Sequence, residues 1–258
     1  MPTADDDFQP ARWLRNHHLQ SMLASTSWRR GRILRQSAPL LAAAREVLLD
    51  CGENVRLQCF ISTPPQDTPV PVVLLHGWEG RADSLYMLSL ARQLFERGFE
   101  VVRLNLRDHG DTHHLNRELF HSCRLPEVIG AVAAVQRLAK GRPLRLVGFS
   151  LGGNFMLRVA AKAREAGLRI AKVVAISPVL DPVQTLHELE NGHGLYHWYF
   201  IRKWNRSLVK KQAAWPKHHD FTEFLRLSSL RDKTAEMVAK FTQFASLDEY
   251  LNGYSITG

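Results

Sequence analysis

The sequence predicts an α/β fold with a mostly parallel sheet and helices on both faces. Short apolar runs alternate with helical patterns from residue 71 to residue 179, which is typical of βαβ units. The chain has 258 residues and is 45% hydrophobic, enough for one sizeable core. We therefore expect a single domain, with first strands in 1–62, a core in 63–181 and a helical lid region in 182–258.

The segment before residue 63 predicts a short helix at 18–24 and strands at 46–50 and 55–61. The run PVVLLHG at 71–77 is continuously apolar and ends in glycine, which suits a strand buried on both faces. Asp83 or Ser84 then caps a helix.

The remaining core elements follow the same alternation. After Pro182 the chain reads as helix and loop only. The sequence predicts strands at 100–106, 144–149 and 171–179, and helices at 128–138 and 151–166.

Composition narrows the class of protein. The formal net charge is +9, and 191–219 holds six basic and no acidic residues. The N-terminus lacks the basic and apolar regions of a signal peptide. The three cysteines show no metal-ligand spacing, so we expect free thiols and a cytoplasmic protein.

The stretch GFSLGGN at 148–154 is the strongest chemical signal. It places Ser150 where a strand turns sharply into a helix. Gly148 and Gly152 leave room where the two backbones nearly touch, as in the G-x-S-x-G nucleophile elbow. We expect Ser150 to be a nucleophile, with the N–H of Leu151 as the first oxyanion donor.

A second element agrees with that reading. HGW at 76–78 ends the strand 71–75, and in this architecture such a loop supplies the other oxyanion N–H, here from Trp78. Each donor is worth roughly 3–4 kcal/mol when lost. We interpret His76 as a structural residue that holds the loop.

These motifs give the chain a specific resemblance. RNHHLQ at 15–20, HGWEG at 76–80, NLR at 105–107 and GFSLGGN together resemble the α/β-hydrolases, and more narrowly the AB hydrolase 4 family of esterases and lipid hydrolases. The resemblance implies a serine-dependent carboxylic ester hydrolase that acts on acyl chains, without metal or organic cofactor. Asp108 and His109 depart from the small residues that many members carry there.

The loop DHGDTHH at 108–114 has a competing interpretation. Imidazole and carboxylate groups are metal ligands. A metal-dependent hydrolase is therefore the less favoured alternative, and we expect a polar loop at the rim of the serine site. The candidate ligands are His109, Asp111, His113 and His114.

The lid contains LYHWYFIRKWNRSLVKK at 195–211, with aromatic residues beside bases. In one interpretation, the aromatic residues form an apolar wall for an acyl chain and the bases contact anionic lipid headgroups at a membrane. A second is an amphipathic helix packed on its own domain. Nucleic-acid binding is not expected.

The serine lacks evident partners. In this fold the acid and then the histidine follow the serine, and the resemblance implies that both come after two further strands. Asp181 is the candidate acid at a variant position. We expect a hydrolase lacking these last two strands; alternatively, a lid histidine substitutes or the chain is a non-catalytic binding protein. The later histidines are His187, His193, His197, His218 and His219.

Overall fold

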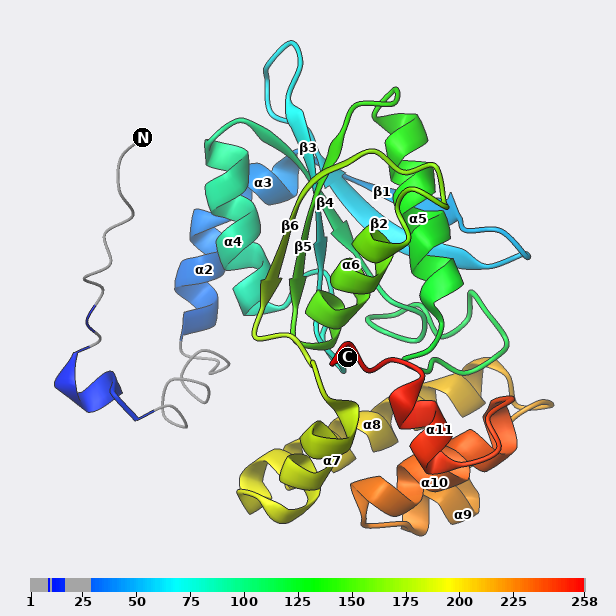
Figure 1. Cartoon of the computed structure of the whole chain (residues 1–258). Helices are drawn as coiled ribbons and strands as arrows, with labels where there is room; N and C mark the ends of the chain where they lie inside the picture. The colour runs from blue at the N-terminus through cyan, green and yellow to red at the C-terminus, as the bar shows by residue number, and fades with distance from the viewer. Residues whose placement is uncertain (1–8, 10, 17–28, 258) are drawn as a thin grey trace.

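The structure is a computed structural model, and it describes residues 9, 11–16 and 29–257 (Figure 1). The predicted helix at 18–24 lies outside the described residues. A short 3₁₀ turn, η1, covers Arg12–Leu14.

A six-stranded sheet forms the centre of the molecule, in the order β1-β2-β4-β3-β5-β6. The pairs β4–β3, β3–β5 and β5–β6 are parallel, whereas β1–β2 and β2–β4 are antiparallel. The predicted mostly parallel sheet is therefore confirmed. The strands are β1 (Ala44–Asp50), β2 (Arg56–Ser62), β3 (Val70–Leu75), β4 (Phe99–Leu104), β5 (Leu144–Phe149) and β6 (Ile170–Ile176).

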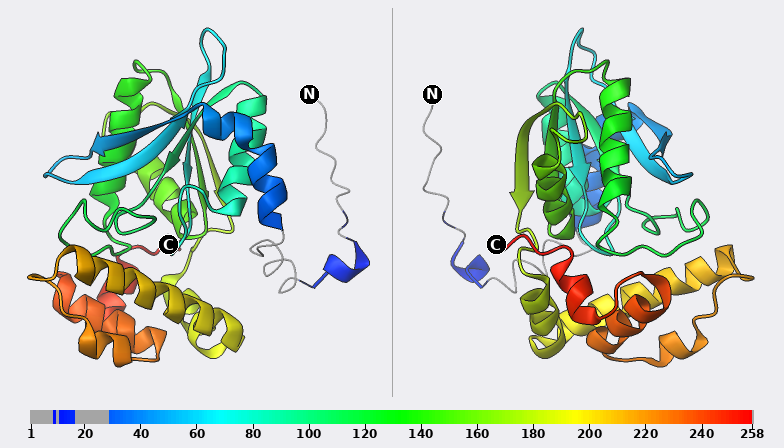
Figure 2. Two further views of the ribbon diagram at one scale, coloured as in Figure 1. Left: turned by 180° about the vertical axis from the view of Figure 1, so that it is seen from behind. Right: turned by 45° about the vertical axis from the view of Figure 1, so that its right-hand side comes forward.

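Helices cover both faces of the sheet, as expected (Figures 1 and 2). One face packs against α2 (Arg30–Gln36), α3 (Ala38–Ala42) and α4 (Leu85–Glu96) around Leu74 and Leu88. The sequence analysis did not anticipate α2 and α3, which are short. The other face packs against α5 (Leu125–Leu138) and α6 (Leu151–Ala161).

Three predicted elements end earlier than expected, and one of them is strand β4, which stops at Leu104 rather than at residue 106. Helix α6 stops at Ala161 rather than at residue 166, and the chain turns through Gly167, whose φ is +65°. Strand β6 stops at Ile176 rather than at residue 179, because Ser177 has a φ of +46° and leaves the extended conformation. Periodicity alone does not reveal such left-handed positions.

All described elements after residue 181 are helices, and they form a lid below the carboxyl ends of the parallel strands (Figure 1). The lid has its own apolar cluster, which includes Leu208, Phe221 and Phe224. Its helices are α7 (Pro182–Asn191), α8 (Gly194–Ala214), α9 (Thr222–Arg226), α10 (Leu230–Phe241) and α11 (Leu247–Asn252).

Strand β6 is the last strand of the described sheet and pairs on one side only, with β5. Its Val174 and Ile176 are exposed. In the described structure this strand therefore presents an unpaired, partly apolar edge. Over the same described range, no helix has both the length and the apolar character needed to cross a membrane.

Candidate active site

Ser150 lies at the corner between β5 and α6, with φ +52° and ψ −120°. Non-glycine residues rarely adopt such a conformation, which costs of order 1–3 kcal/mol. Three backbone hydrogen bonds hold it: the Ser150 N–H donates to the Ile176 carbonyl (2.9 Å), and its own carbonyl accepts from Asn154 (3.1 Å) and Val179 (3.4 Å). The residue is exposed, and its hydroxyl has no hydrogen-bond partner among the described residues.

Gly148 and Gly152 lie where β5, β3 and α6 approach one another. A Cβ on Gly148 would lie 2.2 Å from the carbonyl oxygen of Gly152. A Cβ on Gly152 would lie 2.4 Å from the carbonyl oxygen of His76. Neither position has room for a side chain, so both glycines are needed for the close approach that places Ser150 at the corner.

The loop after β3 packs directly against the serine. A Cβ on Gly77 would lie 3.1 Å from the Cβ of Ser150. Trp78 comes next, and neither its N–H nor that of Leu151 has a hydrogen-bond partner in the described part of the chain. Leu151 begins α6, so its N–H carries the positive end of the helix dipole. Both N–H groups are therefore free to donate hydrogen bonds to a negatively charged oxygen beside Ser150.

His76 holds this loop in place. Its Nδ1–H donates to the Gly77 carbonyl (2.8 Å), and its Nε2 accepts the Leu106 N–H (3.2 Å). The ring is completely buried, and burial lowers the pKa of His76 well below its usual value. Both nitrogens are engaged in structural bonds, in agreement with the interpretation of His76 as a structural residue.

His109 plays a similar part on the neighbouring loop. Its Nδ1–H donates to the Arg107 carbonyl (2.7 Å), and its Nε2 accepts the Glu79 N–H (3.1 Å). Burial lowers the pKa of His109 to about 4. The ring is therefore neutral at pH 7, and it offers no free nitrogen to Ser150 or to a metal ion.

The other candidate metal ligands point to separate partners. His113 Nε2 hydrogen-bonds the Ser207 hydroxyl (2.9 Å), Asp111 pairs with Lys210 (2.8 Å), and His114 is exposed. Within residues 9, 11–16 and 29–257, no three histidine, cysteine or acidic side chains are placed to share a metal ion. The loop 108–114 instead bonds to α8.

A buried ion pair is the centre of that contact. The Lys211 ammonium donates to Asp108 Oδ1 (2.8 Å), to the Glu118 carbonyl (3.0 Å) and to the Asn116 carbonyl. All three ammonium protons are thereby used. Ser207 donates to the Asp108 carbonyl (3.2 Å) from the same helix. Helix α8 is thus fastened to the loops at the carboxyl edge of the sheet.

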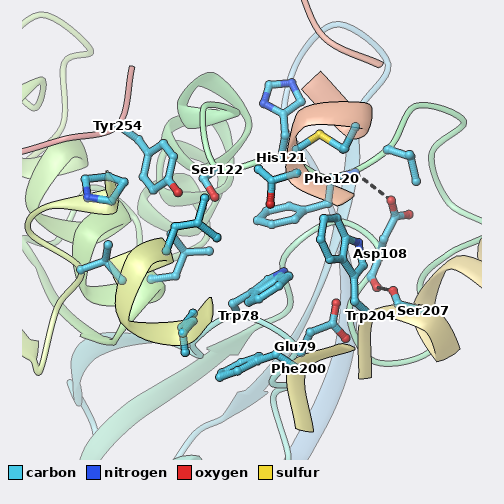
Figure 3. Close-up of a pocket in the computed structure, with 18 of the residues that line it drawn as sticks. Trp78, Glu79, Asp108, Phe120, His121, Ser122, Phe200, Trp204, Ser207 and Tyr254 are labelled. Carbon is cyan, nitrogen blue, oxygen red and sulfur yellow. Dashed lines mark hydrogen bonds between the residues drawn. The ribbon is translucent and has the colours of Figure 1, made fainter. Parts of the chain in front are cut away.

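A cavity of about 270 Å³ lies between this edge and the lid, and both Ser150 and Leu151 line it. Aromatic rings form much of its wall (Figure 3). The ring of Trp78 stacks on Phe200 at 5.0 Å and meets Trp204 edge-on at 5.2 Å. Phe120, Tyr250 and Tyr254 line it as well. The space suits an apolar chain that begins at the serine.

Helix α8 has two faces. Phe200, Trp204 and Leu208 line the cavity, so the helix packs on its own domain. On the other side Trp198 is 55% exposed, with the Arg202 guanidinium over its ring. Membrane contact through this outer face stays a prediction.

The structure does not bring Asp181 to the serine through a histidine. The Asp181 carboxylate is exposed and caps α7 by accepting the Gln184 N–H (3.0 Å). His193 caps α8, His197 lies 3.5 Å from Glu190, and His219 bonds the Arg117 carbonyl. None of the five later histidines lines the cavity.

One cavity residue received no role in the sequence analysis. Glu79 follows Trp78 directly, and burial raises the pKa of its carboxyl group to about 8. Its position beside HGW was the only available sequence signal. Its environment depends on α8, more than 120 residues later, as the contact with Lys203 shows.

Comparison with known proteins gives consistent results. Residues 70–253 match the model of the family described as alpha/beta hydrolase fold. The protein named "Putative esterase YheT" from Escherichia coli (strain K12) is 26% identical over 212 residues, which is 81% of this chain and 60% of that protein. The chain thus spans about three fifths of the length of this curated relative.

Solved structures agree at the level of the fold. The Pyrococcus furiosus esterase Pf2001, in space group P21, superposes with a TM-score of 0.50 at 19% identity, covering 65% of each chain. Its P212121 form gives the same TM-score at 18% identity, covering 65% of this chain and 62% of the other.

Proposed function

The chain belongs to the alpha/beta hydrolase fold family, and from this premise we propose that it is a serine-dependent carboxylic ester hydrolase with Ser150 as nucleophile. We further propose that it belongs to the AB hydrolase 4 branch and acts on small acyl esters or lipids. The observation that carries the proposal is the placement of Ser150. Its strained corner lies at an apolar cavity, beside two backbone N–H groups that have no partner in the described structure.

The proposed chemistry begins with attack of the Ser150 oxygen on the ester carbonyl carbon, while the hydroxyl proton passes to solvent water. The carbonyl oxygen becomes an oxyanion, which accepts hydrogen bonds from the N–H groups of Trp78 and Leu151. The bond between the carbonyl carbon and the alkoxy oxygen then breaks, and that oxygen takes a proton from water and leaves as the alcohol. A second water adds to the acyl carbon, the bond to Ser150 breaks, and the carboxylic acid leaves as Ser150 regains its proton. This route uses neither a metal ion nor an organic cofactor.

Removal of the proton from the Ser150 hydroxyl is the step that no described side chain assists. No described histidine hydrogen-bonds the serine, and His109, which lines the same cavity, has both nitrogens engaged. Binding and oxyanion donors alone sustain roughly 10³–10⁴-fold catalysis over water in triad hydrolases that have lost a member. We expect turnover of this chain at about that level.

A fluorophosphonate probe tests the proposal. We expect covalent labelling at Ser150, slow hydrolysis of short p-nitrophenyl esters, and loss of both in Ser150→Ala. Mass spectrometry of the labelled peptide locates the adduct. An adduct elsewhere, or equal ester hydrolysis by Ser150→Ala, would contradict the proposal.

A second candidate is a non-catalytic ligand-binding protein with a hydrolase fold. The absence of a hydrogen-bond partner for the Ser150 hydroxyl within the described residues favours it. In that case apolar esters bind to the cavity and remain intact, and the probe leaves Ser150 unmodified.

A further inference from the structure

Glu79 has an unusual backbone that its surroundings hold on both sides. Its φ is +56°, a conformation that non-glycine residues seldom adopt. The N–H donates to His109 Nε2 (3.1 Å), and the carbonyl accepts from the Lys203 ammonium (3.3 Å). One contact comes from the loop after β4 and the other from α8. Together they fix where the Glu79 side chain can go.

The carboxyl group of Glu79 has no such partner. It forms no hydrogen bond or ion pair with any residue that the structure describes. It lies in the cavity wall among the rings of Trp78, Phe200 and Trp204 (Figure 3). The residue is only partly buried, and neither of its carboxyl oxygens is among the fully enclosed polar atoms that lack a partner. The carboxyl group therefore faces the cavity and is available to hydrogen-bond a ligand bound there.

Burial and the surrounding charges change the pKa of the Glu79 carboxyl group. Desolvation is the largest effect and Asp108 adds to it, and the net result of all nearby groups is a pKa of about 8. Lys203 and Lys210 on α8 oppose that rise. Asp108 is itself paired with Lys211, and the facing ring of His109 is neutral. At pH 7 the carboxyl group is therefore mostly protonated and is a hydrogen-bond donor.

We propose that Glu79 determines ligand specificity by donating a hydrogen bond to an uncharged oxygen acceptor on an apolar ligand in the cavity. The inference rests on the proposed function for the identity of that ligand as an ester. It makes the preferred substrate a neutral acyl ester with a second acceptor oxygen, as in a keto-acyl or a diester compound. An unsubstituted hydrocarbon chain would leave the Glu79 carboxyl group unpaired.

Calorimetric binding of octan-2-one tests the donor role, because a ketone oxygen accepts and cannot donate. The measurements use Ser150→Ala protein, in which the ketone cannot add to the serine. We expect the dissociation constant to be about threefold larger at pH 9 than at pH 7, since only the protonated carboxyl group donates and it contributes one net hydrogen bond.

Glu79→Gln in the same background is the matched control. Its amide N–H donates at every pH, so we expect binding that is independent of pH between 7 and 9. Glu79→Leu removes the donor, and we expect about fivefold weaker binding at pH 7, equivalent to one net hydrogen bond.

An equal affinity at pH 7 and pH 9, or the same pH dependence in Glu79→Gln, would overturn the proposal. Labelling of Ser150 by the fluorophosphonate probe is measured separately, on protein that carries no substitution. Failure of labelling alone argues against the ester hydrolase, whereas a flat binding profile argues against Glu79.

Discussion

At the scale of single residues, the geometry of Ser150 requires that Gly152 has no side chain. The α-carbon of Gly152 therefore approaches the carbonyl oxygens of Leu75 and His76. This contact joins α6 to β3 and holds the serine at its left-handed corner. A serine at such a corner therefore requires space behind it as well as hydrogen bonds around it.

Gly152→Ala tests this requirement. The added Cβ would lie 2.4 Å from a backbone oxygen, and overpacking of this kind costs about 1–3 kcal/mol or more. We expect a loss of that size in the free energy of unfolding, measured by urea denaturation.

Gly31→Ala is the control for that substitution. Gly31 lies in α2 with nothing within 4 Å of a new Cβ, and alanine is favoured over glycine in a helix by about 0.5–1 kcal/mol. If Gly152→Ala were tolerated as well as Gly31→Ala, the close approach would not constrain the site.

At the scale of elements, α8 connects the lid to the core. Its cavity face carries Phe200, Trp204 and Leu208. Its polar groups reach back to the loop at 108–119, where Lys211 is fully buried. The lid therefore has a polar anchor beside an apolar wall, and the cavity shape depends on both.

Lys211→Met tests this anchor. Removing one member of a buried pair leaves the other charge uncompensated and costs about 3–5 kcal/mol. We expect a loss of that order in the free energy of unfolding. Combining it with Asp108→Asn is expected to restore part of the loss, since no charge then stays buried.

The neighbouring Lys210 provides a matched control. It also pairs with a carboxylate, Asp111, but 43% of its side chain and 78% of that of Asp111 are exposed. Exposed pairs contribute about 0–1 kcal/mol. Equal effects of Lys210→Met and Lys211→Met would show that the buried pair is not an anchor.

At the scale of the whole molecule, buried histidines make stability depend on pH. Burial lowers the pKa of His109 to about 4, that of His113 to about 3 and that of His121 to about 3, and it also holds the pKa of His76 well below the usual 6.5. The unfolded chain binds protons near pH 6.5, whereas the folded chain does not. The contribution is thus present above pH 6.5 and is lost as the pH falls toward the folded values.

Glu79 acts in the opposite direction. Its folded pKa of about 8 lies above the usual 4.5, so its contribution is complete at low pH and is lost as the pH rises from 4.5 to 8. Burial also lowers the pKa of His219 and raises that of Asp108. Five histidines are thus opposed by Glu79 and Asp108, which leaves a net effect of about three groups between pH 6 and pH 5. We expect stability to fall by about 4 kcal/mol per pH unit in that window.

Urea denaturation at pH 7.5, 6.5, 5.5 and 5.0 measures this slope. His121→Asn removes one buried imidazole and is expected to reduce the slope by about 1.4 kcal/mol per pH unit. A free energy of unfolding that stays constant from pH 6.5 to pH 5 would contradict the inferred neutral state of these rings.

The sequence by itself determined the alternation of strands and helices, the sheet class and the corner at Ser150. These features depend on short-range information: apolar runs of strand length, helical periodicity, and glycines at fixed spacing from the serine. The exact ends of α6 and β6 were missed, because left-handed residues such as Ser177 carry no periodic signal.

Only the tertiary structure decided which polar groups meet. His109 and His113 were candidate metal ligands only in the less favoured interpretation of their loop, and in the structure His109 bonds Glu79 and His113 bonds Ser207. Lys211 is one of the six basic residues of 191–219, and the structure buries it against Asp108. The protonation state of Glu79 likewise follows from its burial. Such partners are 30 to 103 residues apart in the chain, and only the folded backbone brings them within hydrogen-bonding distance.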